Sequence, residues 1–463
     1  MKAICFYFQI HQPFRLKTYH FSDIGNDHYY YADFTNEDII THLAECSYIP
    51  ANEMLLDMIK ENGKNFKVAF SITGTMLEQF ELYVPEWIDS MKELVKTGCV
   101  EILSETYSHS LASLTDPLEF AQQVKDHDDK IFQIFGVKPK VFRNTELIYS
   151  DDISQMIHGM GFKGAIIDGA KHILGWKSPN YVYSSAAVPK LKLILKNSKL
   201  SDDISFRFSN TEWSEFPLTA DKFINWIAEL PEEEQIVNLF MNYDTFGELQ
   251  SRETGIFEFM KALPRFAKEH GVSFWTPSET LSHLKLVGEL AVPYPISWAD
   301  EARDTSAWLG NDLQKEAFEK LYALSERIHL CDDRRLKQDW YYLQTSDHFF
   351  YMSTKHQNDG SIHSHYSPYE TPYQAFTNYM NVLSDFIVRV EEQYPLSIEN
   401  EELNSLLITI RNQSKEIEEL HREVAMMRNN ILKADDENTV DEDEVMIPKK
   451  KKTPAKKKTK KAE

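Results

Sequence analysis

Short, unbroken apolar runs recur along roughly the first 280 residues of the chain. They are rich in β-branched and aromatic residues and show no clean alternation with polar residues. This pattern predicts strands that are buried on both faces. The runs are "AICFYFQI", "FKVAFSI", "VEILS", "KVFRN", "KGAIID", "ISFRF", "IVNLFM" and "VSFWT".

Apolar residues at helical spacing fill most of the intervals between these runs. The segments "ANEMLLDMIKENG", "VPEWIDSMKELVKTG" and "PLEFAQQVKDHDDKIFQIFG" each end in Gly, which commonly stops a helix. Alternating strands and helices predict a parallel sheet, and about seven or eight such units predict a closed or nearly closed barrel. The alternative is an open, doubly wound sheet. Its dinucleotide-binding version is disfavoured because no GxGxxG motif follows the first strand.

The pattern changes along the chain, and these changes give the expected domains. "LKLILK" predicts a hairpin or an excursion before "ISFRF", whereas "DLQKEAFEKLYALSERI" and "PYQAFTNYMNVLSDFIVRVEEQ" predict helices. We expect a (β/α)7-type barrel over residues 1–290, a helical domain over 291–396, a coiled-coil helix over 397–433 and a disordered tail over 434–463.

Residues 403–431 carry a heptad pattern that indicates a homodimer. β-Branched residues dominate one core position and Leu or Met the other, which favours a parallel two-stranded coiled coil. Gln413 would lie in the seam and fix the register. The alternative is a single helix that packs on its own domain. The core positions are Leu403, Leu406, Ile410, Gln413, Ile417, Leu420, Val424, Met427 and Ile431.

The net charge of −22 argues against a nucleic-acid-binding protein, because a phosphate backbone would be repelled. The charge is uneven, since an acidic run, "DDENTVDEDE", precedes a Lys-rich end, "KKKKTPAKKKTKK". The Lys-rich tail is expected to contact polyanions, to aid solubility, or to pair with the acidic run. Aromatic residues make up 13% of the chain, which suits either stacking on sugars or a core rich in Phe and Tyr.

The four cysteines are scattered, at Cys5, Cys46, Cys99 and Cys331, and indicate neither a zinc site nor a disulfide framework. The N-terminal sequence lacks the features of a signal peptide. No window is long and apolar enough to span a bilayer, and no lipidation motif is present. We therefore expect a cytoplasmic protein without membrane contact.

Polar residues follow several of the predicted strands, where parallel barrels carry their chemistry. Any single one reads as a loop residue or helix cap, but their recurrence indicates an acidic pocket with aromatic neighbours. Such a pocket suits a neutral polyhydroxylated substrate with a cationic transition state, as in glycoside hydrolysis. The residues are His11, Gln12, Glu101, Glu105, His109, Asn144, Glu146, Asp168, Asn242, Asp244, Ser278 and Glu279.

Two further readings concern a metal and a stacking platform. His11, His109 and nearby carboxylates would make a metal site of the deacetylase kind, but no HxxxH or HExxH spacing is present, so we expect no metal. Trp176 is a candidate sugar-stacking residue, with a packed Trp as the alternative.

Five of these motifs resemble, in order, the signature regions of glycoside hydrolase family 57, and above all its α-amylases and bacterial amylase-like members. They are "FQIHQPFRL", "GCVEILSETYSHSL", "VFRNTELIYS", "LFMNYDTFGE" and "FWTPSETL". The resemblance covers roughly residues 1–390. It implies an incomplete (β/α)7 barrel followed by helices and a retaining mechanism on α-glucans that needs no cofactor.

The resemblance also implies roles for particular residues. Glu146 falls on the position of the nucleophile, His11 on a histidine that binds sugar hydroxyls, and Glu101 on the carboxylate of the second motif. The family's general acid is an Asp at the position where this chain has Asn242. A carboxamide has no proton to give near neutral pH. Asp244, two residues on, shares a face with Asn242 in an extended strand and is a possible replacement.

The sequence is therefore consistent with two functions. The first is an active α-glucan enzyme, either an α-amylase or a glucanotransferase, for which the retained Glu146 and His11 argue. The second is an amylase-like protein that binds α-glucan and turns it over poorly, for which Asn242 argues. The sequence does not choose between water and a sugar as the acceptor.

Overall fold

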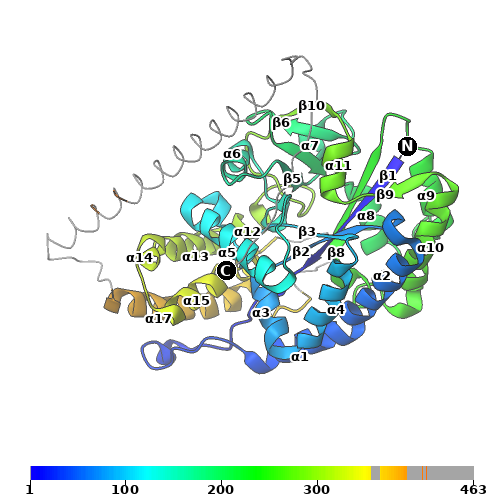
Figure 1. The fold of residues 1–463 in the computed structure, drawn as a ribbon. Coiled ribbons are helices and arrows are strands. Elements are labelled where there is room, and N and C mark those ends of the chain that lie inside the picture. Colours follow the sequence, from blue (N-terminus) through cyan, green and yellow to red (C-terminus); the bar gives the residue numbers. More distant parts are fainter. Residues whose placement is uncertain (1, 356–364, 394–408, 410–412, 414–463) are drawn as a thin grey trace, which may run out of the picture. The chain divides into compact units, whose positions relative to one another are not determined.

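The computed structural model describes residues 2–355 and 365–393, together with Thr409 and Gln413. One compact unit comprises Met1–Tyr394 (Figure 1). The helices that follow residue 291 belong to this same unit. The domain boundaries expected at 290 and 396 stay predictions. Apart from Thr409 and Gln413, the predicted coiled coil and the Lys-rich tail lie outside the described residues.

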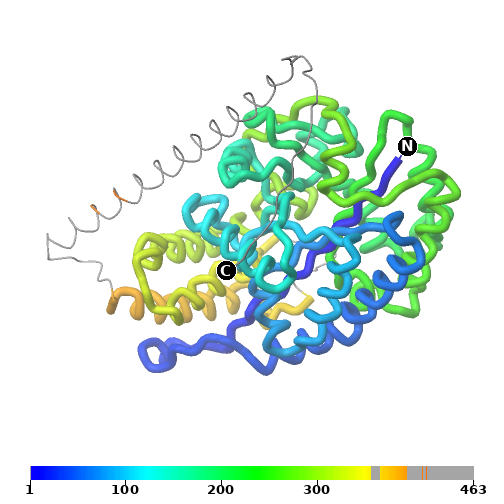
Figure 2. The backbone as a smooth tube through the Cα atoms, in the orientation of Figure 1, coloured from blue at the N-terminus to red at the C-terminus, as the bar shows by residue number. Residues whose placement is uncertain are grey.

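The first sheet is built around the opening strand of the chain. Strand β1 (Lys2–Ile10) is almost fully buried and pairs in parallel with β2 (Val68–Ile72) and β8 (Ile236–Asn242). Near its start β1 also pairs with β9 (Val272–Phe274), and β2 pairs with β3 (Val100–Ile102). Figure 2 shows the blue first strand beside green segments that come much later in the sequence.

The second sheet contains four strands from the middle of the chain and one later strand. β4 (Phe142–Arg143), β5 (Gly164–Ile167) and β7 (Lys192–Leu195) are parallel. β6 (Val182–Ser185) pairs antiparallel with β7 and parallel with β10 (Leu286–Leu290). The hairpin that "LKLILK" predicts is therefore present as β6 and β7.

Backbone hydrogen bonds join the two sheets at both sides. On one side Ser104 N–H donates to the Val141 carbonyl at 3.0 Å, and Arg143 N–H donates to the Ser104 carbonyl at 2.8 Å. On the other side Asn197 N–H donates to the Asn238 carbonyl at 2.9 Å. As a result, the carboxyl ends of β1, β4 and β8 border one shared space.

The helices cover the sheets in two groups, each with its own apolar core (Figure 1). The first group packs on β1, β2 and β8: α1 (Asp33–Leu43), α2 (Ile49–Asn62), α3 (Gly74–Tyr83), α4 (Pro85–Lys96), α8 (Ser198–Ser205), α9 (Ala220–Ala228) and α10 (Ile256–Glu269). The second contains α5 (Pro117–Phe135), α6 (Asp151–Gly159), α7 (Lys171–Leu174), α12 (Ser306–Leu309), α13 (Asp312–Tyr322), α14 (Ser325–His329), α15 (Arg334–Leu343), α16 (Ser346–Phe350) and α17 (Pro372–Gln393). The short α11 (Pro277–His283) follows β9.

Most predicted elements are found, and one is wrong. The segment "ISFRF" was expected to be a strand, but its first two residues end helix α8 and the rest forms a turn. Leu200, Ile204 and Phe208 are buried at intervals of four, which is the spacing of a helix face. Asn197 accepts a hydrogen bond from Leu200 N–H at the start of α8 and so caps the helix.

The expected α/β class, with a parallel sheet and many helices, is confirmed. Among the described residues, no helix combines the length and the apolar character needed to cross a bilayer.

Candidate active site

A cavity of about 680 Å³, partly open to solvent, lies at the carboxyl ends of the strands. Residues at or after the ends of β1, β3, β4 and β8 line it together, as the strand-end argument predicts. Among the predicted site residues, these are His11, Gln12, His109, Glu146, Asn242 and Asp244.

Glu146 lies just beyond β4 in a single 3-10 turn, Thr145–Leu147. Its φ angle is +54° and that of Leu147 is +53°. Residues other than Gly rarely adopt this left-handed conformation, and such strain is concentrated at functional sites. The turn interrupts the extended chain and leaves the Glu146 side chain at the cavity, where its exposed fraction is 2%.

Three hydrogen-bond partners surround the Glu146 carboxylate. Trp298 Nε1 donates to Oε2 at 2.6 Å, while His109 Nε2 lies 3.0 Å and Ser346 Oγ 3.3 Å from Oε1. Donors of this kind favour the ionised carboxylate and fix its orientation. The arrangement can therefore hold a charged carboxylate at the cavity wall, ready to face an electron-poor carbon.

His109 connects Glu146 to a second buried carboxylate. Its Nδ1 lies 3.3 Å from Oε2 of Glu105, which is also 3.4 Å from Nη1 of Arg143. Burial disfavours a charged imidazole, but the hydrogen bonds with Glu105 and Glu146 outweigh it and raise the pKa of His109. Burial also opposes ionisation of Glu105, yet His109 and Arg143 lower its pKa to about 2. Glu105 thus acts on the cavity through His109.

The pKa of His11 shifts in the opposite direction from that of His109, although the two rings stack with centroids 4.1 Å apart. Its Nδ1 lies 2.9 Å from Thr73 Oγ1 and its Nε2 lies 2.9 Å from Asp347 Oδ2. Burial, followed by the charge of His109, lowers the pKa of His11 to about 4, against the opposing effect of Asp347. His11 is therefore a neutral imidazole near pH 7, and Thr73 and Asp347 engage both of its ring nitrogens.

The carboxyl end of β8 carries the amide and the carboxylate that the sequence predicted there. Asn242 is the last residue of β8, and Asp244 follows in the turn Tyr243–Thr245; both line the cavity. Tyr243 between them turns away and donates a 2.8 Å hydrogen bond to Asn52 of α2. Asn242 and Asp244 therefore share a face, as their spacing predicts.

Three predicted binding residues need separate mention. Gln12 lines the cavity, and its Oε1 accepts a 2.6 Å hydrogen bond from Arg15. Glu101 does not line it: this residue lies in β3, three positions before the sheet bridge at Ser104, and accepts hydrogen bonds from Ser278. Trp176 is also outside the lining and is 93% exposed. Its sequence neighbourhood suggested a platform, but α7 ends before it and leaves it on the surface.

Sequence reasoning missed several lining residues. Trp298, Asp347 and Tyr351 come from the region after the strands, where no strand-end argument applies. Arg143 is the last residue of β4 and Gln9 lies within β1, so both could have been found from the strand pattern. No pattern in the sequence predicted that the Trp298 indole N–H would reach the cavity, because its position depends on how the chain folds back over the sheet after the last strand.

Comparison with known proteins connects this cavity to one family. The model of "Glycosyl hydrolase family 57" matches residues 5–293. A Methanocaldococcus jannaschii protein named "Putative alpha-amylase" is 39% identical over 450 residues, which cover 94% of each chain.

The chain belongs to glycosyl hydrolase family 57.

Solved structures agree with this family 57 fold. A branching enzyme from Thermococcus kodakaraensis has a TM-score of 0.60 at 13% identity, covering 88% of this chain and 94% of that one. A 4-alpha-glucanotransferase from Thermococcus litoralis has a TM-score of 0.55 at 16% identity. That match covers 75% of this chain but only 56% of the glucanotransferase. At such identities the likeness shows the fold alone.

Proposed function

We propose that this family 57 chain is a retaining glycoside hydrolase that acts on α-glucans, of the α-amylase type, with Glu146 as its nucleophile. The observation that carries the proposal is the Glu146 carboxylate at the cavity wall, held by Trp298 and His109. The relative named "Putative alpha-amylase" supports the choice of glucan. We also propose that the two joined sheets act as an incomplete barrel around this cavity.

The first step is attack by an oxygen of Glu146 on the anomeric carbon of a glucosyl unit. The glycosidic bond breaks, the sugar passes through an oxocarbenium-like state, and a glycosyl ester forms on Glu146. Water then attacks the same carbon, gives its proton to the group that protonated the leaving sugar, and frees the Glu146 carboxylate, so the anomeric configuration is retained overall. Hydrogen bonds from His109 and Trp298 keep the carboxylate charged before attack. The same two side chains remain beside the uncharged ester that forms afterwards. We propose that neutral His11 binds a sugar hydroxyl in exchange for its contact with Thr73 or Asp347.

The leaving sugar oxygen needs a proton, and Asn242 does not supply one. General acid catalysis typically contributes on the order of 10²–10⁴-fold to rate. Asp244 is our proposed replacement, because it lines the same cavity two residues further on. In a retaining enzyme its carboxyl group would act about 5–5.5 Å from that of Glu146.

The second candidate is a protein that binds α-glucan and turns it over poorly, and Asn242 is the observation in its favour. The two candidates differ in turnover, not in binding. They also share three further predictions. A homodimer through 403–431 and polyanion contact by the tail concern segments that are almost entirely outside the described residues. The third prediction is a cytoplasmic location.

The test compares hydrolysis and binding of a maltooligosaccharide by the native protein and the Glu146→Gln variant. Hydrolysis by the native protein that is lost in Glu146→Gln, with binding retained, supports the enzyme. Binding without turnover, with turnover gained in Asn242→Asp, supports the binding protein. Glu269→Gln is the matched control, because this carboxylate is exposed at the end of α10, outside the cavity lining, and its loss should leave turnover unchanged. Absence of both binding and turnover would refute both candidates.

A further inference from the structure

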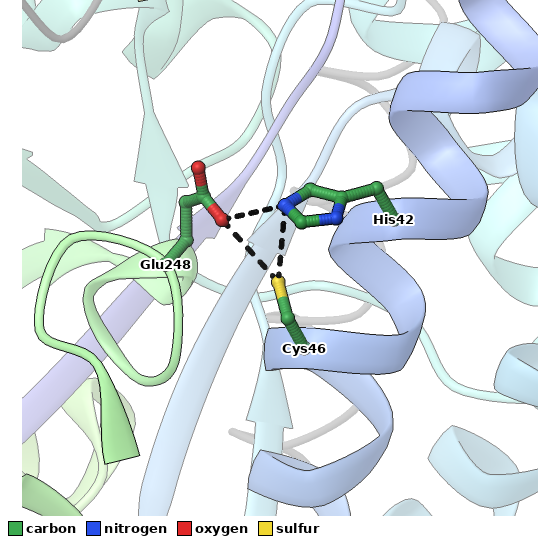
Figure 3. A group of neighbouring side chains, drawn as sticks. All are labelled: His42, Cys46 and Glu248. Atoms are coloured by element: carbon green, nitrogen blue, oxygen red, sulfur yellow. Dashed lines mark hydrogen bonds and ion pairs between the residues drawn. The ribbon is translucent and has the colours of Figure 1, made fainter. Parts of the chain in front are cut away.

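A histidine, a cysteine and a glutamate converge beside the cavity and take no part in the proposed reaction. His42 is the penultimate residue of α1, and Cys46 lies in the π-helical turn Ala44–Tyr48 that continues it. Glu248 comes from the loop after β8, 202 residues from Cys46. Figure 3 shows the three side chains pointing toward one another from the helix and the loop.

The three ligand-type atoms form a compact triangle. His42 Nε2 lies 2.9 Å from Glu248 Oε2 and 3.7 Å from Cys46 Sγ, and Cys46 Sγ lies 3.3 Å from the same carboxylate oxygen. Ligands of a tetrahedral zinc ion are separated by about 3.4–3.6 Å, given the usual zinc–ligand bond lengths. The observed separations therefore need changes of about 0.5 Å or less to accept such an ion.

The chemistry of the three groups selects the kind of ion. A thiolate and an imidazole are poor ligands for magnesium or calcium, and together with one carboxylate they suit zinc. A thiolate and a carboxylate also balance the two positive charges of the ion. The spacing of four residues places His42 and Cys46 on the same side of the helix.

Other contacts fix Glu248 in place. Its second oxygen, Oε1, lies 2.8 Å from His365 Nε2 and accepts a 2.6 Å hydrogen bond from Tyr366. Partners of this kind orient a carboxylate that binds a metal. The preceding residue, Gly247, comes so close to the helix that an added Cβ would lie 2.0 Å from the Cys46 carbonyl oxygen. The loop and the helix are thus brought together by backbone contact as well as by side chains.

We propose that His42, Cys46 and Glu248 bind one zinc ion, with water as the fourth ligand. His365 orients the carboxylate. The ion joins the helix to the loop that follows β8. Within that loop, Glu248 N–H and Leu249 N–H both donate to the Asp244 carbonyl. The site lies at the edge of the cavity, and zinc binding there does not depend on which glycoside the protein cleaves.

The first test measures zinc bound to the full-length, tag-free protein after chelation and reloading with zinc alone. The expected result is one zinc per chain for the native protein and a loss of that zinc in His42→Ala, Cys46→Ser and Glu248→Gln. His42 is largely exposed, so His42→Ala should fold even if Cys46→Ser does not. His270→Ala, which removes another exposed histidine, is the matched control and should retain the zinc.

The second test follows the Cys46 thiol itself. Cys5, Cys99 and Cys331 are buried, whereas Cys46 is partly accessible. Zinc should therefore slow alkylation of Cys46 in the native protein and have no such effect in His42→Ala. Cobalt in place of zinc should give a thiolate-to-cobalt charge-transfer band that disappears in Cys46→Ser. No stoichiometric zinc, or equal zinc in the native protein and His42→Ala, would overturn the proposal.

Discussion

The indole N–H of Trp298 donates a 2.6 Å hydrogen bond to Oε2 of Glu146, across a sequence separation of 152 residues. The backbone reinforces this contact, because Trp298 N–H donates to the Glu146 carbonyl at 3.4 Å. The carboxylate at the end of β4 is thus oriented by the segment that follows the last strand. The chain beyond the sheets therefore completes the site.

Replacing Trp298 with Phe should slow glycosyl transfer without abolishing binding. A hydrogen bond to a charged group contributes about 1.5–3 kcal/mol, so we expect kcat on a maltooligosaccharide to fall roughly 10- to 100-fold. KM should change much less, because the lost bond orients the nucleophile and does not hold the sugar. Trp275→Phe is the control, since this ring packs edge-to-face against His283 outside the cavity lining. An unchanged kcat in Trp298→Phe would contradict the role of the indole.

The missing acid at Asn242 predicts a dependence on the leaving group. A substrate whose leaving group needs no proton, such as a glycosyl fluoride, should react readily with the native protein. A maltooligosaccharide needs the proton that we assign to Asp244, so Asp244→Asn should lower its rate by on the order of 10²–10⁴-fold. The same substitution should change the rate on the fluoride far less. Equal losses on both substrates would show that Asp244 acts by some means other than proton donation.

His11 should make the protein less stable in acid. Its pKa is about 4 in the folded protein and 6.5 when unperturbed. The unfolded chain therefore binds more protons between these values. The stabilisation from a neutral His11 is complete above pH 6.5 and is lost as pH falls toward 4. The loss amounts to roughly 3 kcal/mol.

The measurement is the free energy of unfolding from pH 4 to 7 in native protein and in His11→Asn. The variant should lose less stability in acid than the native protein does. His270→Asn, at an exposed position, should follow the native curve. If His11→Asn also follows the native curve, His11 is not held neutral by burial between His109 and Asp347.

Gly247 should tolerate no side chain. Its φ is +111°, and an added Cβ would lie 2.0 Å from the Cys46 carbonyl oxygen. Gly161 has a comparable φ of +97° but open space around it. Gly161→Ala therefore measures backbone strain alone. Gly247→Ala adds a clash with backbone and should lower the free energy of unfolding by about 1–3 kcal/mol more. Equal losses in thermal or chemical denaturation would mean that the loop moves aside freely.

Much of the fold was predictable because the strands are continuous apolar runs and the helices have clear spacing. The "ISFRF" segment failed for a local reason: Ile204 and Phe208 fit either period, and the cap at Asn197 selects a helix. β4 was predicted as a strand but pairs over only Phe142–Arg143, since the turn that carries Glu146 begins at once.

The site was predictable where it follows strand ends and not elsewhere. His11, Glu146 and Asn242 lie at or just beyond the ends of buried strands, so their meeting follows from parallel pairing. Glu101 is the middle residue of the short strand β3 and accepts hydrogen bonds from Ser278 instead of lining the cavity, so its role in binding stays a prediction. Trp298 and Asp347 lie where the helices return over the sheets, and only three-dimensional packing brings them to the cavity.

Mass spectrometry of the intact protein with a slow-reacting fluorinated α-glucosyl fluoride tests the central claim most directly. Fluoride leaves without a proton, so the missing acid at Asn242 does not interfere. We predict a covalent glucosyl adduct that peptide mapping assigns to Glu146 and that is absent in Glu146→Gln. An adduct on Asp244 or another residue, or an unmodified protein that still hydrolyses the glucan, would contradict the assignment of Glu146 as the nucleophile.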